Sequence, residues 1–289
     1  MRALALLLAL LASVASLTLS AQPRPADDVT ATLAGVAEYV QGYFARAQSI
    51  ICDETVRVQE LGYDLLSAAN PARIVRTELR VSWGDTDADG TTQPPQILRN
   101  LISVNGRPPR AKDRDKCFDP AETSPEVLGE LFLPQNRSKF AFTSKGRGKQ
   151  GGRAALLLDI RDLATGPVEV ESDENCARFG KPGNVVWRAW IEPATFAVMR
   201  LDQSLISTYG VTIPANRKEH TPSRDVVVER SDTSVVYRQV SFKDPDEALF
   251  LPATRDTVQV IRDSPTPRMR ISYAYRNYRR FMTGGRIVQ

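Results

Sequence analysis

One stretch of the sequence alternates between apolar and polar side chains: Val75-Arg76-Thr77-Glu78-Leu79-Arg80-Val81-Ser82-Trp83. Because successive side chains of a β-strand point to opposite faces of a sheet, this period of two predicts a strand with one buried face. Residues 55–59 resemble a strand before it, and residues 97–104 a strand after it. The dipeptide Asn105-Gly106 ends the latter and is typical of a tight hairpin turn, which joins antiparallel neighbours.

The same alternation recurs along the rest of the chain and indicates about ten strands in all. The later strands are predicted at residues 139–144, 155–161, 185–191, 196–205, 226–229, 234–242, 254–261 and 269–275. Short turns are predicted between most of them, including 192–195, Arg230-Ser231-Asp232 and 263–267, and these again indicate antiparallel pairing. The chain lacks a strand–helix–strand rhythm, which disfavours a doubly wound α/β fold.

Two helices interrupt this pattern. A short second helix, capped by Ser124 with Pro125 at its first position, is predicted to end at Pro134. The first helix is amphipathic and is capped by Asp27 or Asp28, and its apolar side chains recur at helical spacing at Leu33, Val36, Ala37, Val40, Phe44 and Ala47. A long antiparallel sheet should curl. We therefore predict a mainly β (α+β) fold: a single large curved antiparallel sheet, or half-barrel, with the helices covering one face.

The N-terminus is typical of a secretory signal peptide. Arg2 precedes an apolar run over residues 4–19, which is followed by the small or polar residues Ser20, Ala21 and Gln22. We predict a signal peptide at 1–21, a tether at 22–28, one β domain at 29–283 and a tail at 284–289. The protein is then exported, to the periplasm or the extracellular space. An uncleaved membrane anchor is the alternative, although polar residues interrupt the run.

The charge of the chain is only mildly basic. The formal net charge is +4 and the sequence pI is about 9.0, with basic and acidic residues interspersed. This balance permits peripheral contact with anionic lipid without requiring it.

The three cysteines divide into one in an apolar setting and two in polar sequence. Cys52 follows Ile50-Ile51 and is interpreted as a small buried hydrophobe. Cys117 and Cys176 lie in loop-like polar segments, where two thiols in an oxidising compartment tend to pair. We predict a Cys117–Cys176 disulfide, and three free thiols are the alternative.

Asp85, Asp87 and Asp89 precede Gly90 and match the first positions of a calcium loop. The twelfth position is Gln96 instead of the bidentate glutamate, and no flanking helix is predicted. The loop is therefore only a weak calcium candidate, and a solvated hairpin loop is the simpler interpretation.

Residues 146–151 (Gly-Arg-Gly-Lys-Gln-Gly) match the glycine pattern of dinucleotide-binding loops. Such a site needs a buried parallel strand before the glycines and a helix after them, and neither is predicted. We interpret this segment as a flexible basic hairpin loop.

Few residue types point to catalysis. His220 is the only histidine, and one histidine cannot build a typical zinc site. No G-x-S-x-G motif is present. The aromatic and arginine residues over 273–281 fit the final strand of a sheet better than a nucleic-acid surface. We predict no catalytic residues, no cofactor and no nucleic-acid partner.

Several segments together carry a resemblance to a known group of exported proteins. Residues 190–195 (Trp-Ile-Glu-Pro-Ala-Thr) resemble the W-I-D-P-x-T hairpin of exported bacterial proteins, and residues 198–201 (Val-Met-Arg-Leu) resemble the V-x-R-L strand after it. Residues 251–253 and 275–281 resemble the closing strands of that group. The element order is similar to that of the outer-membrane lipoprotein carrier (LolA-like) and sigma-factor-regulator sensor domains. The resemblance implies a curved half-barrel whose concave face can hold lipid.

Three function classes follow as expectations. The first is a non-catalytic envelope protein that binds a lipid, a lipoprotein acyl chain or another apolar ligand in the concave face. The second is a structural or protein-interaction module that recognises an envelope protein. The third is a hydrolase with an unrecognised site.

Overall fold

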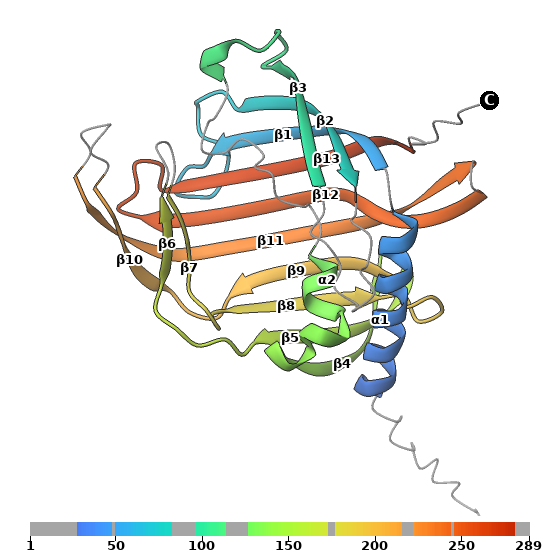
Figure 1. The fold of residues 1–289 in the computed structure, drawn as a ribbon. Helices are drawn as coiled ribbons and strands as arrows, with labels where there is room; N and C mark the ends of the chain where they lie inside the picture. The colour runs from blue at the N-terminus through green and yellow to red at the C-terminus, as the bar shows by residue number, and fades with distance from the viewer. Residues whose placement is uncertain are drawn as a thin grey trace, which may run out of the picture.

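The computed structural model describes residues 28–47, 50–82, 96–113, 127–172, 177–215, 222–243 and 246–280. They contain helix α1 (Val29–Arg46), helix α2 (Leu128–Phe132), the short 3-10 helices η1 (Ala111–Asp113) and η2 (Pro134–Lys139), and a large sheet (Figure 1). The strands of the large sheet are β1 (Ile50–Glu60), β2 (Arg73–Ser82), β3 (Gln96–Val104), β4 (Phe140–Gln150), β5 (Arg153–Asp162), β8 (Val185–Ile191), β9 (Val198–Leu205), β10 (Tyr209–Ile213), β11 (Arg224–Lys243), β12 (Asp246–Arg262) and β13 (Arg268–Arg280).

The 11-stranded sheet has the order β3-β2-β1-β13-β12-β11-β9-β8-β5-β4, and β10 pairs with β11. Neighbouring strands are antiparallel, and the sheet is not closed into a barrel. A separate two-stranded hairpin consists of β6 (Glu169–Ser172) and β7 (Ala177–Gly180). In Figure 1 the sheet curves, and the two α-helices and the hairpin lie on its concave side. The predicted fold class is confirmed.

Helix α1 forms where the apolar spacing predicts it, and its buried stripe packs on the sheet. Asp28 is the N-cap, because its side chain accepts a hydrogen bond of 2.9 Å from the backbone N–H of Thr30. Gly35 allows a close approach to the turn between β8 and β9, since a Cβ atom there would lie 2.5 Å from the ring of Phe196. The main core joins the two helices to β4, β5, β8, β9 and β11 through buried residues that include Leu33, Val36, Val40, Leu131, Phe132, Leu158, Ile160, Ile191, Leu201 and Val235.

The predicted turn at Arg230-Ser231-Asp232 is wrong, because β11 runs straight through it for 20 residues. A β-bulge between Val228 and Arg230 adjusts the pairing with β12 at this point. Arg230 Nε donates a hydrogen bond of 2.5 Å to the Asp232 carboxylate, so these polar side chains are accommodated within the strand.

The predicted flexible loop over residues 146–151 is also wrong in its extent. Strand β4 continues to Gln150 with a bulge between Ser144 and Arg147, and the turn is confined to Gly151 and Gly152. These two glycines have φ of 55° and 81°, and a two-residue turn with positive φ at both positions fits the twist of a hairpin.

The other differences concern short elements. Strands β6, β7 and β10 were not predicted, and α2 is followed by η2, with Pro134 at its first position. The predicted cap Ser124 lies outside the described residues. Asn105 and Gly106 have φ of 49° and 78°, as the predicted hairpin turn requires, and the turn over 263–267 joins β12 to β13. In the described part of the chain, neither α-helix combines the length and apolar character needed to cross a lipid bilayer.

Candidate functional site

The strand register identifies the side chains that share the concave face. Val235 belongs to the core under the helices and pairs directly with Leu201 on β9 and Arg255 on β12. Arg255 in turn pairs with Tyr273 on β13. Directly opposed residues of antiparallel strands project to the same face, so these side chains lie on the helix-covered side, called the inner face from here on.

The β6–β7 hairpin crosses the inner face at the end away from α1 (Figure 1). Its apolar side chains Val170 and Phe179, with Val168 before it, pack against a buried group on β10 and β11 that consists of Tyr209, Val211, Val226 and Val228. Between the hairpin and the sheet is a pocket of about 140 Å³, called the end pocket from here on. Its volume is close to that of the roughly 150 Å³ engineered cavity that binds benzene. The end pocket can therefore hold a small apolar group.

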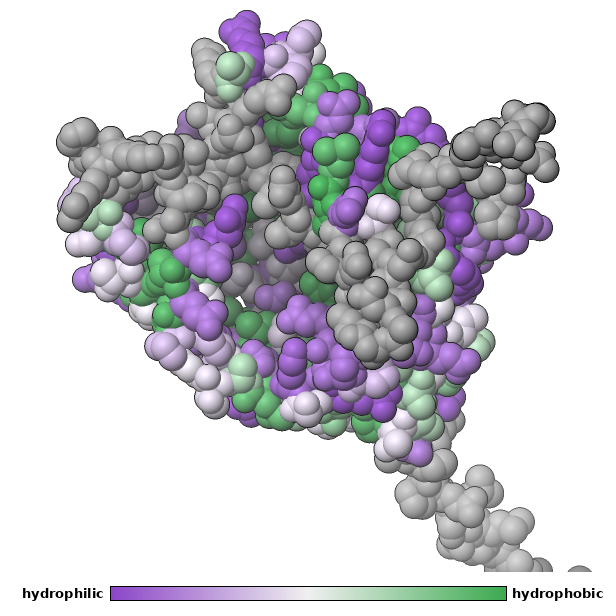
Figure 2. Space-filling model, viewed as in Figure 1, coloured by the Kyte–Doolittle hydropathy of each residue, from purple (hydrophilic) through white to green (hydrophobic). Residues whose placement is uncertain are grey.

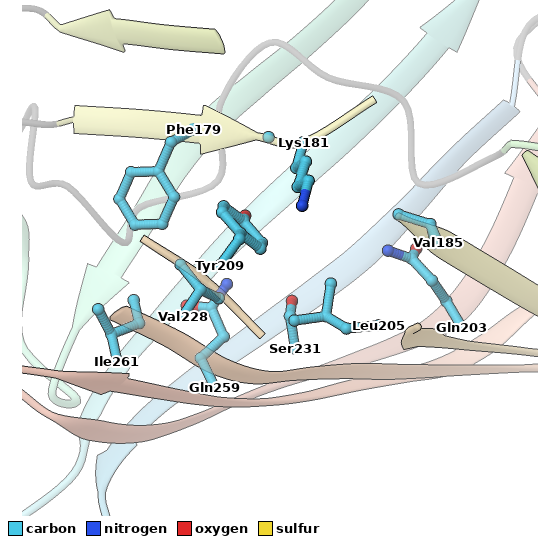
Figure 3. Close-up of a pocket in the computed structure, with 11 residues that line it drawn as sticks. Phe179, Lys181, Val185, Gln203, Leu205, Tyr209, Val228, Ser231, Gln259 and Ile261 are labelled. Atoms are coloured by element: carbon cyan, nitrogen blue, oxygen red, sulfur yellow. The ribbon is translucent and has the colours of Figure 1, made fainter. Parts of the chain in front are cut away.

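The end pocket has an apolar wall and polar side chains at its base and side (Figure 3). In Figure 3 Phe179 and Lys181 point from the hairpin side toward the sheet, and Ser231 and Gln259 point from the sheet toward them. The apolar wall is formed by Phe179, Val185, Leu205, Tyr209, Val228 and Ile261. Burial raises the pKa of the Tyr209 hydroxyl, so this phenol stays neutral.

Four polar side chains of the end pocket are available to a ligand as far as the described residues go. No hydrogen bond to another described residue is made by the side chains of Lys181, Gln203, Ser231 and Gln259. They supply one cationic group, one hydroxyl and two amides. An apolar wall with a few convergent polar groups is the usual composition of a small-molecule site.

Hydrogen bonds of the buried Asn184 and of Gly183 fix the segment that leads from the hairpin to β8. Asn184 is 4% exposed; its Nδ2 donates to Ser207 O at 2.7 Å, and its Oδ1 accepts from Ser207 Oγ at 2.8 Å. The backbone N–H of Gly183 donates to Asp162 Oδ2 at 2.9 Å. Gly183 has a φ of 70°, and a Cβ there would lie 2.0 Å from Ala164 O, so only glycine fits. These contacts hold Lys181 and Val185 against the pocket.

A polar track leads from the end pocket toward the middle of the inner face. Ser231 pairs with Gln259, and Thr233 pairs with Thr257. The hydroxyl oxygens of Thr233 and Thr257 are buried and lie 3.0 Å apart. Two residues beyond Thr257 the track reaches Arg255, whose guanidinium lies 5.7 Å from the centre of the Tyr273 ring. Figure 2 shows that this face is hollowed, with hydrophilic and hydrophobic described residues both visible in the hollow.

A buried ion pair lies beyond Arg255 on β1 and β3. Glu54 is 1% exposed, and its carboxylate accepts two hydrogen bonds from Arg99, from Nε at 2.8 Å and from Nη2 at 3.1 Å. Thr77 Oγ1 donates a third hydrogen bond of 2.8 Å to the same carboxylate. Burial lowers the pKa of Arg99, but the hydrogen bond and charge of Glu54 outweigh it and hold that pKa above its ordinary value. The Glu54 carboxylate is therefore already engaged by Arg99 and Thr77.

Most of the site candidates from the sequence fall outside the described residues. These are Asp85, Asp87 and Asp89 of the calcium loop, both cysteines of the predicted disulfide, Cys117 and Cys176, and His220. Both the calcium site and the disulfide stay predictions. Within the described residues, no group of three or more His, Cys, Asp or Glu side chains could hold a metal ion. Residues 273–280 lie in the last sheet strand, β13, as predicted.

Cys52 is buried at 2% exposure beside Leu79 and Tyr275, which confirms the interpretation as a small hydrophobe. Burial, followed by the negative charge of Glu54, raises the pKa of its thiol to about 12. Since the thiolate is the reactive form, we expect Cys52 to resist iodoacetamide at pH 8 in the folded protein and to react once it is unfolded. Mass spectrometry of tryptic peptides measures this, with Cys52→Ala as the control. Rapid native labelling of Cys52 would contradict the burial described.

Sequence reasoning missed Glu54, Arg99 and Arg255 as site residues. One signal was present for Glu54, because it lies on β1 at the same parity as the apolar residues Cys52 and Val56. A carboxylate in a buried register implies a buried partner. Arg255 has no such signal, since polar residues surround it in β12. Only the pairing with Val235 and Tyr273 places it on the inner face.

No protein-family model matches this chain, and no curated protein sequence matches it. Solved structures do match. A domain assigned to outer membrane lipoprotein sorting from Vibrio parahaemolyticus is 10% identical, with 88% of this chain and 95% of that chain covered and a TM-score of 0.40. A DUF1329 family protein from Desulfovibrio piger is 9% identical, with coverage of 89% and 95% and a TM-score of 0.43. A LolA superfamily protein from Nitrosomonas europaea is 8% identical, with coverage of 88% and 96% and a TM-score of 0.37.

These structures include the LolA superfamily that the sequence resemblance named. Identities of 8–10% and TM-scores below 0.5 give no information on the ligand or the activity of this chain.

Proposed function

We propose that this protein is a non-catalytic, exported protein that binds an apolar or amphipathic small molecule on its inner face. The observation that carries the proposal is the end pocket. It has an apolar wall, and four polar side chains in it make no hydrogen bond to another described residue. A ligand with an apolar part and a polar part satisfies both features at once. The signal-peptide pattern of residues 1–21 supports export to the periplasm or the extracellular space.

Other features of the described residues support binding over catalysis. The buried carboxylate Glu54 already accepts three hydrogen bonds, so it is poorly placed to act as a general base. The Cys52 thiol is buried with a raised pKa, the opposite of an activated nucleophile. Strands provide most of the end pocket, and rigid elements suit a preformed binding site.

The proposal is tested by extraction of the purified protein with organic solvent and mass spectrometry of the extract. We expect an amphipathic or apolar compound in stoichiometric amount. An extract of the folded protein without any such compound, together with no binding of added alkyl probes, would overturn the proposal.

Filling the end pocket should weaken ligand binding. Val185→Trp puts an indole into the pocket wall, and we expect the co-purified ligand to fall about tenfold or more, which corresponds to about 1.4 kcal/mol of binding free energy. Val186→Trp is the matched control, because Val186 is the next residue of β8 and projects to the opposite face. Its ligand content should equal that of the wild type. Equal ligand content in both variants would show that the ligand lies elsewhere.

A further inference from the structure

The strongest unexplained feature of the inner face is Arg255. Its Nε atom is buried and has no hydrogen-bond partner among the described residues. The side chain contacts the face of Tyr273, with the guanidinium 5.7 Å from the ring centre, and makes no ion pair with a described carboxylate. Arg255 is half-buried, and a partly desolvated cation without an anionic partner is costly, so the side chain is expected to have a partner in the functional state.

The neighbouring carboxylate cannot serve as that partner. Glu54 already accepts two hydrogen bonds from Arg99 and one from Thr77. Glu54, Arg99 and Arg255 all act electrostatically on Tyr275, so two guanidinium groups and one carboxylate lie near that ring, and one positive charge is left over. The uncompensated charge is the one on Arg255.

The position of Arg255 relates this charge to the end pocket. Gln259 lines the pocket, and Arg255 is four residues earlier on the same strand and on the same face. At about 3.3 Å per residue, the two are separated by roughly 13 Å. The buried Thr233–Thr257 pair lies between them. Apolar side chains flank this track on both sides, with Leu201 and Leu205 on β9, and Ile271 and Tyr273 on β13.

We infer that the ligand is an amphiphile with an anionic head group, carboxylate or phosphate, that pairs with Arg255 while its apolar chain extends along the inner face into the end pocket. The inference rests on the proposed function and adds the charge and the orientation of the ligand. A guanidinium suits this task because its planar array of donors matches both carboxylate and phosphate oxygens.

The test is isothermal titration calorimetry of the delipidated full-length protein with four probes. These are dodecanoate, dodecyl phosphate, dodecanol and inorganic phosphate. We expect the wild type to bind the two anionic amphiphiles about tenfold or more tightly than dodecanol, because hydrogen bonds between a guanidinium and an anionic oxygen are stronger than those to a neutral hydroxyl. Inorganic phosphate alone should bind far more weakly, because it leaves the pocket empty.

Substitution of Arg255 identifies the residue responsible. Arg255→Gln should remove the preference for anionic probes and leave dodecanol binding intact. Arg238→Gln is the matched control: it lies on the adjacent strand β11, is exposed, and should keep the preference. If Arg255→Gln does not fold, Arg255→Lys retains the charge without the planar donors and should show a reduced preference.

The outcomes separate the inference from the proposed function. Equal affinity of the wild type for dodecanol and dodecanoate would overturn the anionic head group and leave the binding function standing. Tight binding of inorganic phosphate alone would overturn the amphiphile in favour of a free anion. No binding of any alkyl probe would count against both.

Discussion

Replacing Arg99 with leucine is expected to lower the free energy of unfolding by about 3–5 kcal/mol. The substitution removes two of the three hydrogen bonds that the Glu54 carboxylate accepts and leaves that carboxylate buried at 1% exposure. The cost comes mostly from the uncompensated charge, because the ion pair itself gains little over a well-packed apolar pair. Urea denaturation followed by circular dichroism measures the change as a shift in the midpoint.

The double variant Glu54→Leu with Arg99→Leu gives the sharper result. Removing both charges should recover much of the stability lost in Arg99→Leu, and the double-mutant cycle should show a coupling within about 0.5–3 kcal/mol. Arg262→Leu is the matched control, because its ion pair with Glu229 at 3.0 Å is 60% and 40% exposed and should contribute less than about 1 kcal/mol. Equal losses in Arg99→Leu and Arg262→Leu would show that Glu54 is not buried as described.

The sequence predicts the sheet well because its signal is local. A strand that alternates strictly, such as β2, has one apolar face, and the period alone identifies it. The same holds for helix α1, whose apolar stripe has the helical period and whose cap, Asp28, is adjacent in sequence. These elements were placed within a few residues of their observed bounds.

The errors occur where tertiary contacts override local polarity. The polar tripeptide at residues 230–232 has turn composition, but β12 pairs with it and a bulge at Val228–Arg230 absorbs the irregularity. Gly146 and Gly148 suggest a loop, yet β5 pairs with that part of β4 and confines the turn to Gly151 and Gly152. In both cases pairing with the next strand along the chain decides the local conformation, and the periodicity of the segment itself does not reveal that pairing.

Less of the candidate site than of the fold could be predicted from the sequence, because the site depends on which strands are neighbours. Arg255 and Ser231 become site residues only because β12 pairs with β11, and Lys181 because the β6–β7 hairpin folds over the sheet. The hairpin strands are four residues each and carry no strong alternation. The one local signal was in β1, where Glu54 falls on the same alternating positions as the buried residues Cys52 and Val56.

Replacing Phe132 with alanine is the second large effect, with an expected loss of about 3–5 kcal/mol in the free energy of unfolding. Phe132 is 0% exposed and is the last residue of α2, which joins α1 and the sheet in the main core. The substitution removes a buried ring and leaves a cavity between the helices and the inner face. Guanidinium denaturation measures the loss. Tyr63→Ala is the matched control, since that aromatic side chain is 91% exposed and should change stability by less than about 1 kcal/mol.

The Phe132→Ala variant also tests whether the helices contribute to ligand binding. The end pocket is lined by the hairpin and by strands β8 to β12, and no residue of α1 or α2 lines it. Phe132→Ala should therefore lose stability while it keeps the affinity of the folded protein for an alkyl probe. A loss of affinity for the alkyl probe, measured where Phe132→Ala is fully folded, would show that the ligand contacts the helix layer. The chain of the amphiphile would then extend past Arg255 toward the helices instead of ending in the end pocket.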